Sequence, residues 1–214
     1  MQTTHYPLAF PHHTLHGVDF DATTLRPADL LWLPYPALLN RYGHKRQAEH
    51  LAGRIAAVHA LRVFGEKAVP GIGEQRQPLW PAGLYGSISH CGKTAVAVVS
   101  RTPTGIDIER VFDDTLVASL AQEIATDSEL AVLRHSSPGF TLALTLAFSA
   151  KESLYKAFSL NHPELQHFHQ ATVISVDEQQ VRLNIAALTL TVSVRWFLLD
   201  ADTILTVYHT PSTG

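Results

Sequence analysis

The sequence predicts an α+β fold with antiparallel sheets. Helical periodicity and strand-like alternation both occur in each half of the 214 residues. The strands mostly follow one another through short loops, which favours antiparallel pairing because parallel strands need long crossover connections. A hydrophobic content of 46% and a charged content of 16% are typical of an ordered globular chain that can bury a core.

The first half contains one clear helix. Ala48, Leu51, Ala52 and Ile55 recur at spacings of three and four, and Gly65 is a natural stop after them. The elements expected here, in order, are a strand at 15–20, a short helix followed by a loop within 30–39, the long helix at 45–64, an ordered loop rich in Gly and Pro at 66–84, and strands at 85–89 and 94–100 joined by a turn at 90–93.

The second half repeats this kind of order without detectable sequence identity. Thr126 and Glu129 form a capping-box pattern ahead of a short helix. The expected elements are a strand at 104–109, helices at 116–124, 127–134 and 140–159, and strands rich in β-branched residues at 172–176, 180–185, 190–197 and 203–208.

Composition excludes several classes of protein. A net charge of −3 gives no general attraction to nucleic acid, so we expect no nucleic-acid partner and only a local basic cluster at any anion site. A single cysteine, Cys91, rules out an internal disulfide framework and fits a reducing compartment. The first residues lack a signal-peptide pattern, and the apolar run at 140–148 is too short to span a membrane. We expect a cytoplasmic protein, with loose membrane association left open.

Two acids alternate with isoleucines on the strand at 104–109. Asp107 and Glu109 share one face, while Ile106 and Ile108 anchor the other. Like charges so close repel unless a cation or basic group lies between them. Alone, this pattern is more typical of an edge strand with a solvated acidic face.

A third acid lies in the helix at 140–159. Glu152 and Lys156 share a helix face at i,i+4, which alone would be an ordinary surface pair. Together with Asp107 and Glu109, Glu152 completes a set of three oxygen ligands, which favours Mg²⁺ or Mn²⁺ over zinc. Magnesium bound by few carboxylates usually shares its coordination with phosphates and water, so basic residues should lie nearby.

Basic candidates occur in both halves. Lys151 and Lys156 flank Glu152, and Arg46 and Arg54 lie on the first long helix. Arg54 is embedded in an apolar stretch, which favours function over a solvated helix face. The segment 86–90 ends a strand with a hydroxyl and an imidazole and is equally compatible with an anion contact or an ordinary strand end. The sequence contains neither a P-loop nor a G-x-G-x-x-G motif.

These motifs resemble a known family. Gly105-Ile106-Asp107-Ile108-Glu109 followed by Phe148-Ser149-Ala150-Lys151-Glu152-Ser153-Leu154-Tyr155-Lys156 is similar to the paired signature of 4′-phosphopantetheinyl transferases, including the separation of the two blocks. Upstream, Gly53-Arg54, Trp80-Pro81 and Gly86-Ser87-Ile88-Ser89-His90 look like further blocks of the family.

The resemblance implies a pseudo-dimer of two similar α+β subdomains, residues 1–103 and 104–214, each with an antiparallel sheet and a long helix, with the active site in the cleft between them. It implies a monomeric enzyme that transfers 4′-phosphopantetheine from coenzyme A to a serine of apo carrier protein domains, of the kind used in nonribosomal siderophore synthesis, and releases adenosine 3′,5′-bisphosphate.

The resemblance also implies roles for particular residues. Asp107, Glu109 and Glu152 would hold Mg²⁺, and Glu152 or a water it orients would deprotonate the serine. Lys151 and Lys156 would contact the pyrophosphate, Lys156 also counting as catalytic. The coenzyme A contacts expected in all are Arg46, Arg54, Gly73, Arg76, Pro78, Ser89, His90, Asp107, Lys151 and Lys156. Arg46, Arg54 and His90 are assigned to the 3′-phosphate and the loop 73–78 to the adenine.

Two other hypotheses account for part of the pattern. A non-catalytic magnesium–nucleotide binding module explains the acids and lysines but not the context of Phe148 and Ser149. An acidic scaffold that docks carrier domains without chemistry is a third possibility. Transfer to a carrier, measured as a gain of mass, separates the enzyme from both.

Overall fold

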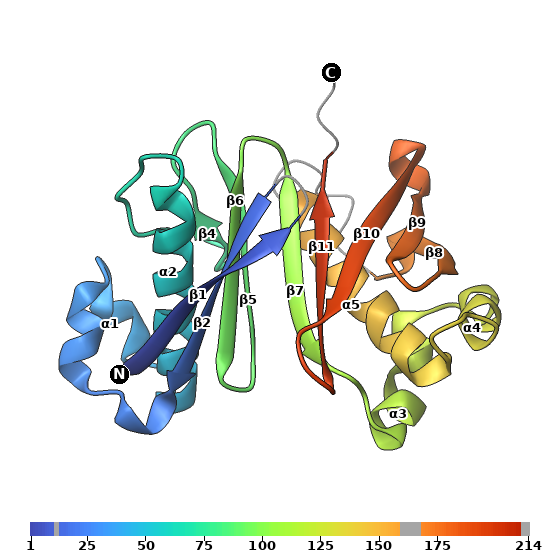
Figure 1. Cartoon of the computed structure of the whole chain (residues 1–214), viewed down its shortest axis with the longest axis horizontal. Helices are drawn as coiled ribbons and strands as arrows, with labels where there is room; N and C mark the ends of the chain where they lie inside the picture. The colour runs from blue at the N-terminus through green and yellow to red at the C-terminus, as the bar shows by residue number, and fades with distance from the viewer. Residues whose placement is uncertain (11–12, 159–167, 211–214) are drawn as a thin grey trace. The chain divides into compact units, whose positions relative to one another are not determined.

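The computed structural model describes residues 1–10, 13–158 and 168–210, and the chain divides into two compact units, Met1–Pro103 and Thr104–Gly214 (Figure 1). Each unit contains an antiparallel sheet and one long helix packed on it. The α+β fold expected from the sequence is therefore confirmed. Ser159, the expected last residue of the second long helix, lies outside the described residues.

The N-terminal unit is a four-stranded sheet in the order β1-β2-β6-β5, covered by helix α2 (Figure 1). Its main elements are β1 (Gln2–Phe10), β2 (His13–Asp21), α2 (His44–Arg62), β5 (Tyr85–Cys91) and β6 (Thr94–Ser100). Smaller elements are the 3-10 helices η1 (Ala22–Thr24) and η2 (Pro27–Trp32), helix α1 (Pro36–Leu39) and the short strands β3 (Gly71–Ile72) and β4 (Pro78–Leu79).

Three details of this unit differ from the sequence-based expectation. Strand β1 was not predicted, because its side chains are mostly exposed or half-buried and show no apolar alternation. The short helix expected before Pro34 and Pro36 is the 3-10 helix η2. The α-helix α1 begins at Pro36, since proline is favoured at the first helical position. The loop at 66–84 contains the hairpin formed by β3 and β4.

The C-terminal unit is a five-stranded sheet in the order β7-β11-β10-β9-β8, with β7 at one edge. Its elements match the expected ones to within a few residues. They are β7 (Thr104–Arg110), α3 (Asp114–Ile124), α4 (Asp127–Arg134), α5 (Phe140–Phe158), η3 (Phe168–Gln170), β8 (Ala171–Val176), β9 (Gln180–Ile185), η4 (Ala186–Leu188), β10 (Leu190–Leu198) and β11 (Thr203–His209). The capping box of Thr126 and Glu129 is present at the start of α4.

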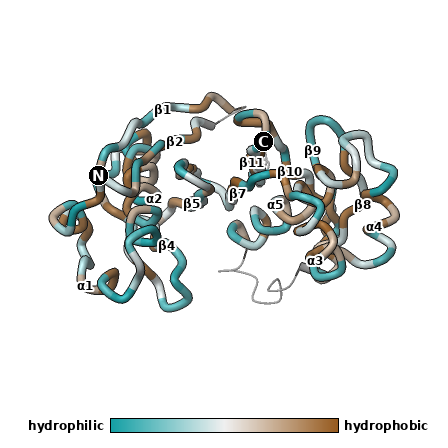
Figure 2. Tube along the Cα trace, turned by 90° about the horizontal axis from the view of Figure 1, so that it is seen from below, coloured by the Kyte–Doolittle hydropathy of each residue, from teal (hydrophilic) through white to brown (hydrophobic). Residues whose placement is uncertain are grey.

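Helix α5 packs directly on β7 and β11 through its small and apolar residues. The side chains of Ala147, Ala150 and Leu154 are almost fully buried, and complete burial of a leucine contributes about 2 kcal/mol. Figure 2 shows both hydrophobic and hydrophilic residues along α4, as expected for a helix with one exposed face. None of the described helices is long and apolar enough to span a bilayer.

Gly105 fixes how closely α5 approaches β7. A Cβ atom at this position would lie 1.9 Å from the carbonyl oxygen of Ser153 and 3.0 Å from the backbone nitrogen of Ala157. The backbones of helix and strand therefore meet with no side chain between them.

We predict that Gly105→Ala lowers the free energy of unfolding by about 3 kcal/mol, because the overlapping atoms are backbone atoms that cannot move aside cheaply. Urea denaturation measures the change. Gly43→Ala is the matched control, since a Cβ there meets nothing within 4 Å. Equal stability of the two variants would contradict this close contact.

Three histidines stack in the N-terminal unit. The rings of His5 and His59 are 3.6 Å apart and nearly parallel, and His5 Nε2 lies 3.0 Å from His16 Nδ1. His16 is buried, and its Nε2 has no hydrogen-bond partner among the described residues. Burial, together with the neighbouring His5 and His59, lowers the pKa of His16 to about 4.

We predict that acid destabilises this unit. The folded-state pKa of His16 lies below its unfolded value of 6.5, so its contribution to stability is complete above pH 6.5 and is lost as the pH falls towards 4. This one group should lower the free energy of unfolding by about 2 kcal/mol between pH 7.5 and pH 5. Denaturation at the two pH values measures it. His16→Phe should show a smaller loss, and an unchanged loss in that variant would assign the effect to other groups.

Candidate active site

The three acids expected to hold a metal lie on two adjoining elements of the C-terminal unit. Asp107 and Glu109 come from β7, and Glu152 comes from α5, the helix packed on that strand. We call Asp107, Glu109 and Glu152 the acid cluster. Ile106 and Ile108, which alternate with the two strand acids, are fully buried, so the expected anchoring of the strand is confirmed.

Asp107 is the most enclosed member of the acid cluster. It is 2% exposed, and both carboxylate oxygens accept hydrogen bonds from α5. Lys156 Nζ donates to Oδ1 at 2.6 Å, and Ser149 Oγ donates to Oδ2 at 2.9 Å. Lys156 also donates to the carbonyl oxygen of Ile106 at 3.2 Å. The side chain of Asp107 is thereby held in one orientation.

The other two acids pack too closely to ionise freely. Burial, followed by the charges of Asp107 and Glu152 against the opposing effect of Lys156, raises the pKa of Glu109 to about 7. Burial, with the charge of Asp107, also raises the pKa of Glu152 although Lys156 lowers it. Carboxylates with raised pKa values beside one cation form a site that attracts further positive charge.

The donor types fit magnesium, but the ligand cage is not preassembled. Within 1–10, 13–158 and 168–210, no group of three or more His, Cys, Asp or Glu side chains stands ready to hold a metal ion. That Asp107, Glu109 and Glu152 together hold Mg²⁺ stays a prediction. The ammonium of Lys156 already lies against Asp107 Oδ1.

Lys151 does not belong to the acid cluster. It is 3% exposed, and its ammonium donates to Glu129 Oε1 at 2.7 Å and to the carbonyl oxygen of Ile124 at 2.8 Å. Glu129 is also buried and accepts from the backbone nitrogens of Thr126 and Val173. The ammonium of Lys151 is therefore committed to a buried ion pair that joins α5 to α4 and β8, which speaks against the expected pyrophosphate contact.

The N-terminal unit brings together the basic residues assigned to the 3′-phosphate. Arg46 Nη1 lies 2.9 Å from His90 Nε2, and Glu49 lies 3.6 Å from Arg46 and 3.8 Å from His90. Burial and then the charges of Arg54, Arg46 and His90 lower the pKa of the neighbouring His50 to about 3. We call Arg46, Arg54 and His90 the arginine–histidine cluster.

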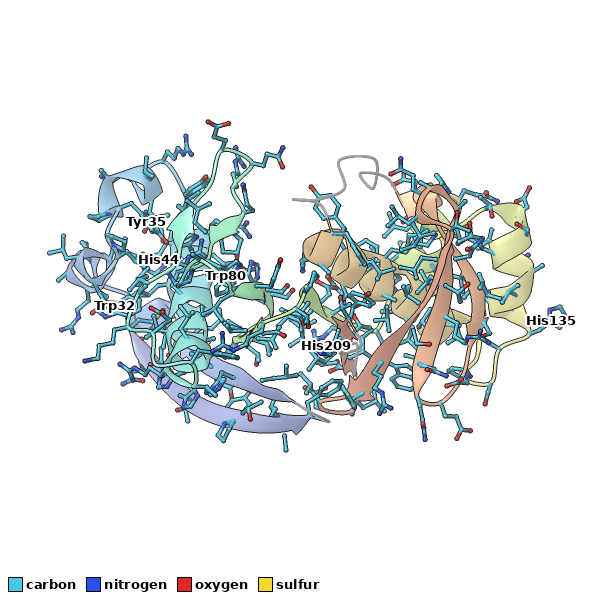
Figure 3. The ribbon with its side chains drawn as sticks, turned by 90° about the horizontal axis from the view of Figure 1, so that it is seen from above. Trp32, Tyr35, His44, Trp80, His135 and His209 are labelled. Atoms are coloured by element: carbon cyan, nitrogen blue, oxygen red, sulfur yellow. The ribbon has the colours of Figure 1, made fainter. Side chains whose placement is uncertain are left out.

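Arg54 is a buried cation without a carboxylate partner among the described residues. Its Nε donates to Tyr35 Oη at 2.9 Å and to the carbonyl oxygen of Pro70 at 3.0 Å, and its Nη2 donates to the carbonyl oxygen of Gly71 at 3.1 Å. Figure 3 labels Tyr35, which also donates to the Pro70 carbonyl at 2.8 Å. Arg54 therefore anchors the start of the loop and keeps a net positive charge, as an anion site requires.

The remaining expected contacts of coenzyme A also lie in the N-terminal unit. Gly73 and Arg76 close the tip of the β3–β4 hairpin, where Gly73 bonds to the backbone of Arg76 and Gln77, and Pro78 begins β4. Ser89 is buried on β5, next to His90. Figure 3 shows His135 pointing away from the C-terminal unit.

Comparison with known proteins decides the family. Residues 35–100 match the 4′-phosphopantetheinyl transferase N-terminal domain, and residues 103–207 match the 4′-phosphopantetheinyl transferase superfamily. The chain belongs to the 4′-phosphopantetheinyl transferase superfamily.

The chain is also similar to several named proteins. It is 52% identical over 203 residues to enterobactin synthase component D of Salmonella typhi, covering 92% of this chain and 86% of the relative. The identity to enterobactin synthase component D of Escherichia coli O157:H7 is 54% over 181 residues, covering 85% and 87% of the two chains. A 4′-phosphopantetheinyl transferase of Mycobacterium tuberculosis, PptT, is 33% identical over 138 residues, covering 62% and 60%.

Sequence reasoning missed several partners of the site. Ser149 lies inside the recognised motif, but its bond to Asp107 follows only from the packing of α5 on β7. Glu129 was identified as a helix-capping residue, whereas its role as the partner of Lys151 depends on a contact 22 residues away. No sequence pattern links Tyr35 to Arg54, although an arginine in an apolar stretch signals that some partner exists.

We predict that Lys151→Met lowers the free energy of unfolding of the transferase by about 3 kcal/mol, because it leaves the Glu129 carboxylate buried without its partner. The KM for coenzyme A of the folded variant should stay near the wild-type value. Denaturation and steady-state kinetics measure the two quantities. A raised KM with unchanged stability would return Lys151 to the substrate site.

Proposed function

We propose that this transferase moves 4′-phosphopantetheine from coenzyme A to a serine of apo carrier domains of enterobactin-type siderophore synthesis, in a magnesium-dependent reaction that releases adenosine 3′,5′-bisphosphate. The observation that carries the proposal is the acid cluster beside Lys156, supported by the basic groups that Arg46, Arg54 and His90 bring together in the N-terminal unit. The high identity to enterobactin synthase component D supports the choice of carriers.

Coenzyme A carries phosphate at two places, and the chain has a basic group suited to each. The arginine–histidine cluster would hold the 3′-phosphate, because Arg54 has no carboxylate partner within the described part of the chain and Arg46 adds an exposed guanidinium. Lys156 would contact the pyrophosphate. Gly73, Arg76, Pro78 and Ser89 remain proposed contacts of the adenosine part.

The acid cluster would supply the metal ligands. When Mg²⁺ is bound, it neutralises charge on the pyrophosphate and on the departing bisphosphate. The fixed orientation of Asp107 supports this proposal, and so do the raised pKa values of Glu109 and Glu152, because a bound cation would favour their ionised forms. Binding would displace Lys156 from Asp107 Oδ1 towards a phosphate oxygen, which exchanges one anionic partner for another.

Glu152 is the proposed base. The serine hydroxyl attacks the phosphorus on the pantetheine side, the P–O bond to the bridging oxygen breaks, and the bridging oxygen leaves with adenosine 3′,5′-bisphosphate. Glu152, or a water that it orients, accepts the serine proton. A carboxylate whose pKa is raised by burial is a stronger base than a solvated one, which suits this step.

The test combines purified transferase, coenzyme A, Mg²⁺ and an apo carrier domain, followed by intact-mass measurement. We expect the carrier to gain one phosphopantetheine, and a carrier whose acceptor serine is alanine to gain none. Asp107→Asn should abolish the gain while coenzyme A binding remains measurable. Tight binding of coenzyme A with no mass gain on any carrier would instead support a binding module.

We predict opposite effects of Glu109→Gln on stability and on activity. At pH 8 the wild-type protein must ionise a carboxyl group with a folded-state pKa of about 7, far above its unfolded value, so the neutral side chain should raise the free energy of unfolding by about 1 kcal/mol. Transfer at limiting Mg²⁺ should fall at least tenfold. The stability gain should vanish near pH 4, where both states are protonated. A loss of stability at pH 8 would contradict the assignment.

A further inference from the structure

A buried chain of three hydroxyl groups joins β11 to the acid cluster. Ser149 and Ser153 come from α5, and Thr206 comes from β11, where it is the register partner of Asp107. All three side chains are 0% exposed. Ser153 Oγ and Ser149 Oγ each lie 2.8 Å from Thr206 Oγ1, and Ser149 Oγ lies 2.9 Å from Asp107 Oδ2.

The direction of these hydrogen bonds follows from counting protons. Each hydroxyl has one proton to donate, and an ionised carboxylate has none. Ser149 must therefore donate to Asp107, and it can only accept from Thr206. Thr206 Oγ1 donates its one proton to Ser149, whose carbonyl oxygen lies at 2.9 Å and whose Oγ lies at 2.8 Å. Ser153 Oγ donates to Thr206, whose Oγ1 lies at 2.8 Å and whose carbonyl oxygen lies at 3.2 Å.

The consequence is that the proton of Ser149 points towards Asp107, and that Thr206 is the hydroxyl next to Ser149. Hydrogen bonds in series polarise one another, so the donor strength of Ser149 depends on Thr206. The bond lies opposite the one from Lys156, so it fixes the carboxylate when the ammonium moves away.

We propose that Thr206 is a positioning residue which, acting through Ser149, orients Asp107 for binding of a divalent cation. It does so without touching the metal or the substrate. This inference rests on the proposed function, because it assumes that Asp107 is a metal ligand. Groups that orient ligands in this way commonly change metal affinity by about 10-fold to 100-fold when removed.

The test measures Mn²⁺ binding to the full chain by electron paramagnetic resonance, with and without coenzyme A, so that binding is read independently of turnover. Thr206→Val keeps the shape of the side chain and removes the hydroxyl. We expect Mn²⁺ to bind about tenfold more weakly to this variant. Thr206→Ser, which restores the hydroxyl, should recover most of the affinity.

Ser153→Ala is the matched control, because it removes a hydroxyl from the same interface at the end of the chain that is remote from Asp107. We expect a loss of affinity of about threefold or less, on the scale of one neutral hydrogen bond acting indirectly. In kinetics, Thr206→Val should raise the Mg²⁺ concentration needed for half-maximal rate, while the rate at saturating Mg²⁺ stays within about threefold of wild type.

The outcomes separate this inference from the proposed function. Wild-type affinity of Thr206→Val for Mn²⁺, together with lost affinity in Asp107→Asn, overturns the role of Thr206 and leaves the function standing. Failure of Thr206→Ser to recover affinity also overturns it, since the methyl group rather than the hydroxyl would then matter. Unchanged Mn²⁺ binding in Asp107→Asn overturns both.

Discussion

The direct contact between the backbones of α5 and β7 at Gly105 is the constraint on which the rest of the C-terminal unit depends. Because no side chain fits between Gly105 and the Ser153 carbonyl, the helix lies close enough for short side chains to reach the strand. Ser149, a residue with a single side-chain oxygen, can therefore bond to Asp107. A helix one side-chain layer further away would leave that carboxylate without its fixed partner.

The same helix carries two lysines with opposite roles. Lys151 faces Glu129 in a buried ion pair whose remaining acceptors are also occupied, which holds α5 to α4 and β8. Lys156 lies beside three acids and offsets only part of their charge. Lys151 and Glu129 balance each other in charge, whereas three acids surround the single ammonium of Lys156. Such an excess of negative charge destabilises the folded chain and is typical of a site that binds a ligand or an ion.

Much of the fold could be predicted from the sequence because α2, α5 and the C-terminal strands have strong apolar periodicity. Strand β1 could not be predicted, since its side chains lie largely at the surface and show no alternation of apolar and polar residues. In the site, the spacing of Asp107, Glu109 and Glu152 is visible as a motif. The roles of Lys151 and Thr206 could not be predicted, because each depends on a contact between residues far apart in the chain. Lys151 and Glu129 are 22 residues apart, and Thr206 and Ser149 are 57 residues apart.

The proposed chemistry requires that the acid cluster binds a divalent cation. Anomalous diffraction from crystals of the full chain grown with Mn²⁺ and coenzyme A tests this most directly. We expect one manganese peak within bonding distance of Asp107 and of at least one of Glu109 and Glu152, with Lys156 moved from Asp107 Oδ1 to a phosphate oxygen. A manganese ion bound elsewhere, with the Lys156–Asp107 pair intact in the presence of coenzyme A, would contradict it.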